Sequence, residues 1–233
     1  MDNIILLTNK FGARAKNSRA SRSKIAERIW REAVPSVGTP VQTYLATARC
    51  LPLPSDVLDA DCIRFHTSCP FQLRSGKLVY VPAMIALMRC VSTNQPKAIH
   101  RTALRLDGSG KADFPEHDDP KRMLGPASGT AIKLTRNEDV LEGLGIAEGI
   151  EDGLTVITAE CRPVWVCGSA GAIKTFPVLL GIEALTIFGD PDRRGFNDAR
   201  VCQRRWQSAG RECVIRIPPR DGEDWNDFLR RSE

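Results

Sequence analysis

The sequence has no long apolar run. None of its 233 residues belongs to a run of about 18 apolar side chains, the length that a membrane-spanning helix requires. The opening segment, MDNIILLTNK, starts with an acid and lacks both a long apolar region and a small-residue cleavage site, so it does not resemble a secretion signal. We therefore expect a cytoplasmic protein with no membrane partner.

Closely paired cysteines are also missing. Eight cysteines are spread over the chain without a CxxC spacing, and several lie inside apolar runs, which is typical of reduced, buried thiols. Cys62, His66 and Cys69 form one cluster. Because a structural zinc site uses four ligands and this cluster offers three, we do not expect zinc.

Positive charge is unevenly distributed. The net charge is +5, and the first 31 residues carry eight Lys or Arg against two acids. Residues 1–22 are polar, basic and without periodicity, which predicts a flexible basic arm. Excess positive charge suits a phosphate-bearing partner, although a solvated basic face gives the same balance.

Residues 23–140 are predicted to form a helical and α+β basic lobe. The segment SKIAERIWREA has apolar residues at helical spacing behind a serine cap, and a second short helix is predicted to begin at Pro40. Strand-like runs such as KLVYVPAMIALMRC and KAIHRTALRL follow, separated by turns. The Pro- and Gly-rich residues 114–130 predict a surface loop.

Residues 141–233 alternate strands and helices. The apolar runs GLGIAE, PVWVCG, ALTIFGD and ECVIRIP are each followed by a helical segment. In the longest segment Ala199, Cys202, Trp206 and Ala209 form one apolar stripe, with the arginines opposite. This alternation predicts an α/β domain with a parallel sheet and helices on both faces.

Acidic residues follow the predicted strands. Glu148 ends the first strand, Asp190 ends the third, Asp192 comes two residues later, and Asp224 follows the last strand. The carboxyl ends of parallel strands form the ligand crevice, and clustered carboxylates repel one another unless a cation lies between them. Mg²⁺ prefers such oxygen ligands. The alternatives are structural: Asp224 as a helix cap and the DPD unit as a turn.

The order of these motifs carries a resemblance. EGIED, CGSAG, DPDRRG and GEDWNDFL resemble the Toprim domain shared by bacterial-type primases, topoisomerases and some nucleases. Upstream segments such as IRFHTSCP and AIHRTALRLDGSGKA are similar to the region before Toprim in phage- and plasmid-type primases. The chain thus resembles a primase polymerase core, without the zinc ribbon or helicase that such primases carry.

The resemblance implies roles for individual residues. Glu148, Asp190 and Asp192 are expected to be catalytic and to bind Mg²⁺ or Mn²⁺, with Asp224 as a further metal ligand. The basic residues expected to contact nucleotide or nucleic acid are Arg101, Lys121, Arg122 and Arg193.

The predicted function is that of a Mg²⁺-dependent, primase-type nucleotidyltransferase in DNA replication, which uses single-stranded DNA and nucleoside triphosphates. A separate helicase or zinc-ribbon protein is an expected partner. Two alternatives stay open: a metal-dependent nuclease with the same acidic rim, and a non-catalytic nucleic-acid-binding subunit of a replication or mobile-element complex. A topoisomerase is disfavoured because Tyr44 and Tyr80 both lie in apolar contexts.

Overall fold

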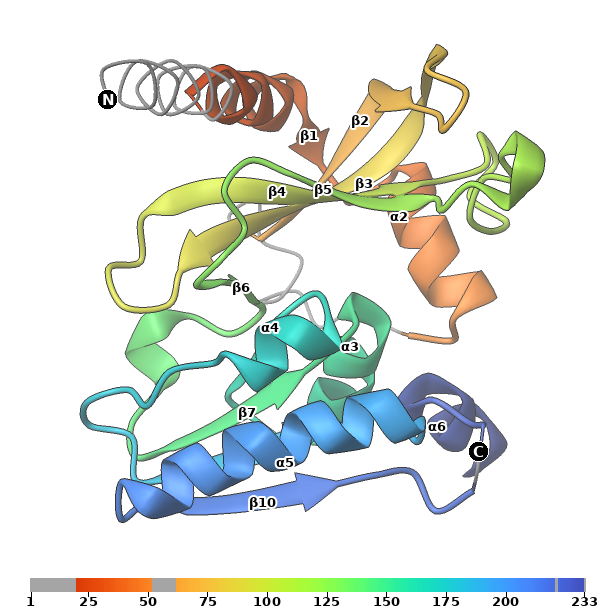
Figure 1. The fold of residues 1–233 in the computed structure, drawn as a ribbon. Coiled ribbons are helices and arrows are strands. Elements are labelled where there is room, and N and C mark those ends of the chain that lie inside the picture. The colour runs from red at the N-terminus through yellow and green to blue at the C-terminus, as the bar shows by residue number, and fades with distance from the viewer. Residues whose placement is uncertain (1–19, 52–61, 221, 233) are drawn as a thin grey trace, which may run out of the picture.

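The computed structural model describes residues 20–51, 62–220 and 222–232 (Figure 1). Residues 20–32 form a helix, so the last three residues of the predicted arm are helical. The rest of the predicted arm lies outside the described residues. No helix in the described part of the chain is long and apolar enough to cross a membrane.

The basic lobe is built mainly from antiparallel strands. Its further elements are β1 (Val34–Pro35), α2 (Pro40–Thr43) with a following π-helical turn (Tyr44–Ala48), β2 (Ile63–Gln72), β3 (Leu78–Cys90), β4 (Pro96–Ala103), β5 (Lys121–Leu124) and β6 (Thr130–Lys133). The helix predicted to begin at Pro40 is α2, where Thr39 accepts a hydrogen bond from the Val41 N–H.

One predicted loop contains a strand. Within residues 114–130, β5 pairs antiparallel with β4, so this part of the prediction was wrong. The strand has only four residues between Pro120 and Gly125, which is too short for a periodic signal. The pairing places Lys121 and Arg122 on a strand rather than on a loop.

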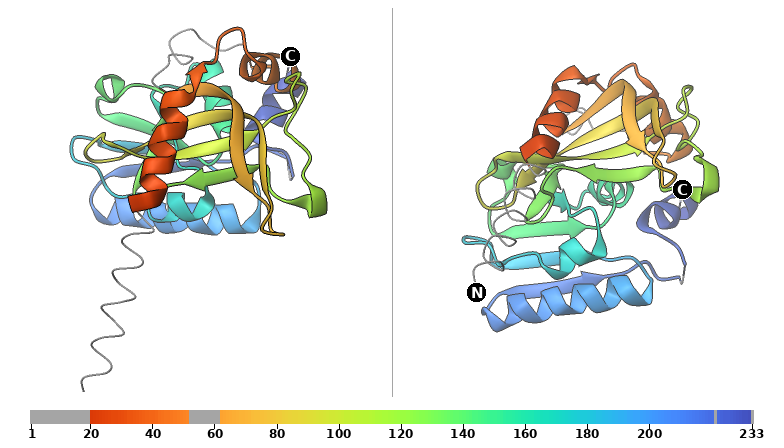
Figure 2. Two further views of the ribbon diagram at one scale, coloured as in Figure 1. Left: turned by 90° about the horizontal axis from the view of Figure 1, so that it is seen from above. Right: turned by 45° about the horizontal axis from the view of Figure 1, so that its top comes forward.

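The C-terminal half confirms the predicted alternation. Its elements are β7 (Gly143–Ala147), α3 (Ile150–Thr158), β8 (Val164–Val166), α4 (Ala170–Lys174), β9 (Ala184–Phe188), α5 (Arg193–Ser208), β10 (Glu212–Arg216) and α6 (Trp225–Ser232). The strands β8, β7, β9 and β10 are parallel in that order. Helices α3 and α6 cover one face and α4 and α5 the other (Figures 1 and 2).

A single sheet connects the two halves. Strand β6 pairs antiparallel with both β3 and β8, which joins the antiparallel and parallel parts into one ten-stranded sheet within the described residues. The basic lobe and the C-terminal half are therefore joined through sheet hydrogen bonds, and their relative position is fixed by the register of β6.

Helix α5 packs against the sheet through the predicted apolar stripe. Ala199, Cys202 and Trp206 are fully buried, and the Trp206 ring stacks on Phe176 at 6.3 Å between centroids. Burying each large apolar side chain contributes roughly 1.5–3 kcal/mol. Ala209 lies just past the helix end and is exposed, so the buried stripe ends at Trp206.

Candidate active site

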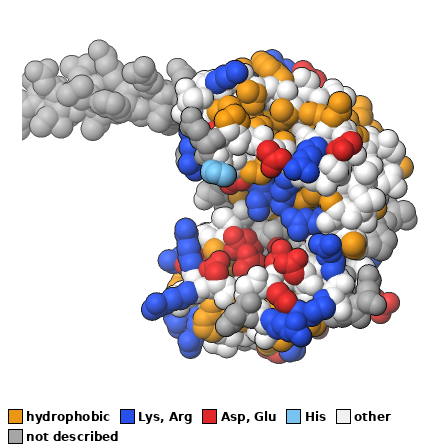
Figure 3. Space-filling model, turned by 90° about the vertical axis from the view of Figure 1, so that its right-hand side faces the viewer, with side chains coloured by type: hydrophobic (Ala, Val, Ile, Leu, Met, Phe, Trp, Pro, Cys, Tyr) orange, Lys and Arg blue, Asp and Glu red, His pale blue; other side chains and the backbone are white. Residues whose placement is uncertain are grey.

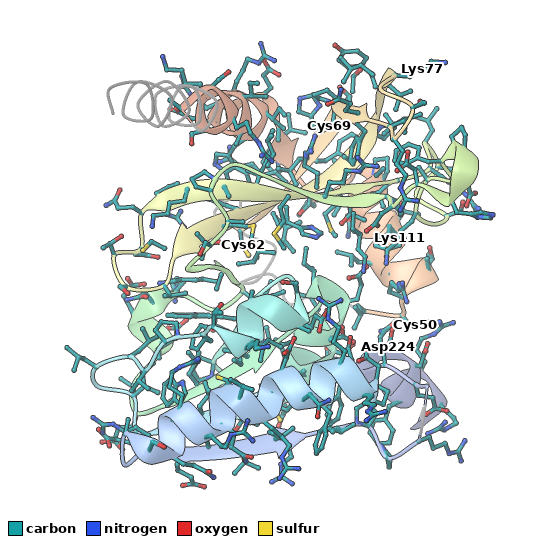
Figure 4. All side chains as sticks on the ribbon, in the orientation of Figure 1. Cys50, Cys62, Cys69, Lys77, Lys111 and Asp224 are labelled. Carbon is teal, nitrogen blue, oxygen red and sulfur yellow. The ribbon has the colours of Figure 1, made fainter. Side chains whose placement is uncertain are left out.

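A cavity of about 440 Å³ lies between the basic lobe and the carboxyl ends of the parallel strands. Its lining is divided by charge except at Asp119. The C-terminal half contributes Glu148, Glu151, Asp152, Asp190 and Asp224, and the basic lobe contributes Arg49, His100, Lys111, Lys121 and Arg122 together with the acid Asp119. Figure 3 shows Lys and Arg side chains facing Asp and Glu across a hollow. In Figure 4, Lys111 and Asp224 reach the same end of the molecule from opposite sides.

Glu148 and Asp190 lie where their strands end. Glu148 follows β7 directly, and Asp190 comes two residues after β9, so the parallel pairing of β7 with β9 brings both to one edge. Burial raises the pKa of Glu148, and the Asp190 charge raises it further. Burial also raises the pKa of Asp190, followed by the charges of Asp192 and Asp224. These carboxyl groups therefore favour a nearby cation.

Asp192 and Asp224 both cap helices. Asp192 accepts a hydrogen bond from the Gly195 N–H at 2.6 Å at the start of α5, and Asp224 accepts one from the Asp227 N–H at 2.7 Å. Asp224 lines the cavity, whereas Asp192 is exposed beside it and does not line it. Each residue thus has the kind of structural role that was considered as the alternative to metal binding. Each cap uses only one carboxylate oxygen, and the charges of Asp192 and Asp224 still raise the pKa of Asp190.

Asp152 is an acid of the cavity that sequence reasoning did not single out. It is buried, and its pKa rises to about 7 because of burial and then the charges of Asp190, Asp224 and Glu151. One oxygen of Asp152 and one of Asp190 have no hydrogen-bond partner. A Cβ at Gly149 would lie 2.4 Å from the other Asp152 oxygen, so the glycine makes room for this carboxylate.

Glu151 is the second acid that was missed, and it joins the two halves. Its carboxylate accepts hydrogen bonds from the Tyr44 hydroxyl at 2.7 Å and from Lys111 Nζ at 2.9 Å, while Arg49 donates to the Tyr44 oxygen. Burial alone would raise the pKa of Glu151, but Lys111 and Tyr44 lower it to about 2. Glu151 is therefore ionised and paired, unlike its neighbour Asp152.

Lys121 and Arg122 present charge to the cavity from β5. Lys121 is exposed, and its charge lowers the pKa of Glu148 and of Asp190. Arg122 forms an ion pair with Asp118 and donates to the Gln72 carbonyl. Lys121 is thus the freer cation of the two.

The other two predicted basic contacts lie elsewhere. Arg101 is buried, where its guanidinium lies 4.9 Å from the Phe71 ring centroid and donates to the Pro70 carbonyl. It therefore cannot present its charge to nucleic acid. Side chains alternate along β4, and His100 occupies the face toward the cavity. Arg193 is exposed on the first turn of α5 and lines a separate depression.

Two family models match the chain, and the boundary between them lies where the basic lobe meets the C-terminal half. The family described as "Domain of unknown function (DUF7146)" matches residues 20–134, and the family described as "Toprim domain" matches residues 143–233. Residues 143–233 are a Toprim domain. Its acids lie at the edge that faces the basic lobe. No curated protein matches the chain significantly in sequence.

Solved structures share the fold over most of the chain. A structure described as the DnaG catalytic core is 14% identical with a TM-score of 0.62, over 90% of this chain and 76% of that one. The DnaG primase catalytic domain bound to ssDNA is 14% identical with a TM-score of 0.59, over 94% and 79%. A DNA primase domain from Pseudomonas aeruginosa is 12% identical with a TM-score of 0.59, over 90% and 74%. The chain thus contains a Toprim domain and shares its fold with primase catalytic cores.

The acidic edge of the Toprim domain fits a divalent cation. Three of its acids have raised pKa values, and two of its buried carboxylate oxygens lack partners. Among the described residues, no three His, Cys, Asp or Glu side chains are already close enough to hold a metal ion alone. Mg²⁺ suits such a loose set because it binds through one or two carboxylates and completes its shell with water and substrate phosphates.

Proposed function

We propose that the protein is a Mg²⁺-dependent nucleotidyltransferase of primase type that joins nucleoside triphosphates on a single-stranded DNA template. One observation carries the proposal: acids with raised pKa values and cations of a second lobe line the same cavity. A structural neighbour is a primase catalytic domain bound to single-stranded DNA, which supports the choice of template.

In the proposed reaction, the 3′-hydroxyl oxygen of one nucleotide forms a bond to the α-phosphorus of the next. The bond from that phosphorus to its bridging oxygen breaks, pyrophosphate leaves, and the hydroxyl proton passes to solvent. Mg²⁺, when bound, supplies positive charge at the attacking and leaving oxygens. The residues that would hold it are Glu148, Asp190, Asp192 and Asp224, with Asp152 added from the structure.

The basic lobe binds and orients the phosphates in this proposal. Lys121 is exposed at the cavity, and Lys111 is held there by Glu151. Arg122 is oriented by Asp118 on the same wall. Cations fixed opposite the acids can hold a triphosphate with its reacting phosphorus toward the Toprim edge. A nuclease needs only the acidic side, so this wall favours synthesis over hydrolysis.

The test is a synthesis assay on the full chain. Single-stranded DNA, labelled ribonucleoside triphosphates and Mg²⁺ or Mn²⁺ are incubated with the protein, and products are separated on a denaturing gel. New labelled oligomers that disappear with Asp190→Asn, and persist with Glu142→Gln at the opposite edge of the sheet, support the proposal. Shortened template without oligomers would make the protein a nuclease. Metal-independent DNA binding without either product would make it a binding subunit.

A further inference from the structure

The outward face of α5 carries an arginine stripe. Arg193, Arg200 and Arg204 are all exposed, with exposed Asn197 between the first two. At about 100° per residue these four positions lie within roughly 60° of one another, opposite the buried stripe. Figures 1 and 2 show α5 as the outermost helix of its layer, with no other element covering it.

The described residues leave this stripe without counter-charge. None of its three arginines forms an ion pair within the part of the chain that the structure describes, and the acid of α5, Asp198, is buried and bonded to Lys174 at 3.1 Å. The exposed face of the helix of residues 20–32 differs, because Arg28 and Arg31 each pair with a glutamate of the same helix. The α5 stripe therefore presents unneutralised positive charge.

An exposed aromatic ring lies beside the stripe. Phe196 is 36% exposed, and the Arg200 guanidinium lies 5.5 Å from its ring centroid. Next to it, Arg193 and Arg194 line a depression together with Lys174. Cations in a row with an adjacent ring suit a single-stranded nucleic acid, whose phosphates bind the cations and whose bases stack on the ring.

The stripe begins beside the active-site cavity. Arg193 comes three residues after Asp190, and from there to Arg204 the helix rises about 16 Å along the outside of the Toprim domain. We propose that this face of α5 binds the backbone of a single-stranded nucleic acid and extends the strand path beyond the cavity. The identity of the strand rests on the proposed function, whereas the binding itself requires no chemistry.

The test measures binding of fluorescein-labelled dT20 by anisotropy in EDTA, over a salt series. The variant is Arg200→Gln with Arg204→Gln, and the control is Arg28→Gln with Arg31→Gln, which removes the same charge from another exposed helix. Each lost phosphate contact should reduce the slope of log K against log salt by about 0.7, so the α5 pair should reduce it by about 1.4 and weaken binding about 25-fold at 0.1 M salt. The control should change affinity less than about twofold. Circular dichroism melts check that both variants fold.

Phe196→Ala supplies an independent readout. Loss of a stacked base should weaken dT20 binding at least about fivefold and leave the salt slope unchanged. Equal effects of the α5 pair and the control pair, or no effect of the α5 pair, would overturn the proposal. Comparing dT20 with U20 separates a template strand from an RNA product. If the synthesis assay fails while the α5 pair still lowers the slope in EDTA, the surface stands and the proposed chemistry falls.

Discussion

The two walls of the cavity differ in how far their charges are satisfied. On the Toprim side, Glu148, Asp152 and Asp190 all have raised pKa values. On the basic side, Arg122 pairs with Asp118 and Lys111 pairs with Glu151, a carboxylate of the opposite wall. Three carboxyl groups of the acidic wall thus have raised pKa values, whereas Arg122 and Lys111 of the basic wall are each held by an ion pair. Under the proposed function, metal binding rather than closure of the lobes would complete the site.

Two adjacent residues of α3 show the same contrast between a paired carboxylate and one that faces other acids. Glu151 reaches Tyr44 and Lys111 of the basic lobe, and its pKa falls to about 2. Asp152 faces the other acids, and its pKa rises to about 7. Both are buried, and burial raises the pKa of a carboxyl group; the charges near Asp152 add to that effect, whereas Lys111 and Tyr44 reverse it at Glu151.

Removing two carboxylates from the acidic wall should have the largest effect on activity. Asp190→Asn with Asp192→Asn should lower metal-dependent synthesis by about 10³-fold, or about 4 kcal/mol, because charge stabilisation at the phosphates is lost. The fold should persist because Asn caps a helix as well as Asp does. Without metal, the melting temperature should rise as repulsion is removed.

The matched control is Glu138→Gln with Glu142→Gln, two exposed acids before β7 at the opposite edge of the sheet. It should leave synthesis unchanged. Unfolding of the Asp190 and Asp192 variant, together with no Mg²⁺-induced stabilisation of the wild type, would contradict the metal assignment.

Asp152 should make stability depend on pH. Its folded pKa is raised from 3.8 to about 7, so its contribution is most favourable below pH 4 and is lost as pH rises to about 7. At pH 8 in EDTA, Asp152→Asn should be more stable than wild type by an amount of the order of 4 kcal/mol, a difference that vanishes near pH 4. Urea unfolding between pH 4 and 8 measures it. A constant difference across this range would refute the assigned shift.

Glu151 should behave in the opposite way. Its folded pKa is lowered from 4.5 to about 2, so its stabilisation is present above pH 4.5 and is lost as pH falls toward 2. Glu151→Gln should cost about 3 kcal/mol at pH 7 because it leaves Lys111 without its partner. Tyr44→Phe removes one hydrogen bond to the same carboxylate and should cost about 1 kcal/mol. Equal costs for the two variants would argue against the ion pair.

The sequence predicted the parts of this site that depend on strand ends. Glu148 and Asp190 were found because they follow apolar runs, and the parallel order of β7 and β9 brings them together. Asp152 was missed because an acid in the first turn of a helix is ordinary helix chemistry. Lys111 was missed because the fold alone brings its turn to Glu151, 40 residues away in sequence.

Arg101 and β5 show a second limit of prediction. Strand β4 alternates His100 toward the cavity with Arg101 away from it, and both are buried. A strand that is covered on both faces gives no polar alternation from which to assign its faces. Strand β5 is short and flanked by Pro120 and Gly125, so its pairing with β4 depends on contacts that the local sequence does not contain.

Glu148 tests whether the acidic wall acts in chemistry or in binding. Glu148→Gln should lower kcat by about 10²-fold and leave the affinity for single-stranded DNA unchanged, because the basic residues supply the binding. A higher Mg²⁺ requirement in the variant would identify Glu148 as a metal ligand. A flattened pH–rate profile at an unchanged Mg²⁺ requirement would identify it as a proton-transfer group. Near wild-type turnover would remove Glu148 from the site.

Lys121 should give the smallest effect and test the basic wall directly. It is exposed at the cavity and unlike Arg122 has no ion pair among the described residues, so its charge is available for a phosphate. Lys121→Gln should weaken dT20 binding about fivefold at 0.1 M salt and lower the salt slope by about 0.7. Lys77→Gln, in the exposed β2–β3 turn, removes the same charge away from the cavity and should change neither quantity. Because binding is measured in EDTA, the acids contribute only repulsion there. A larger slope change for Lys77 than for Lys121 would place the strand on the outer face of the lobe, away from the cavity.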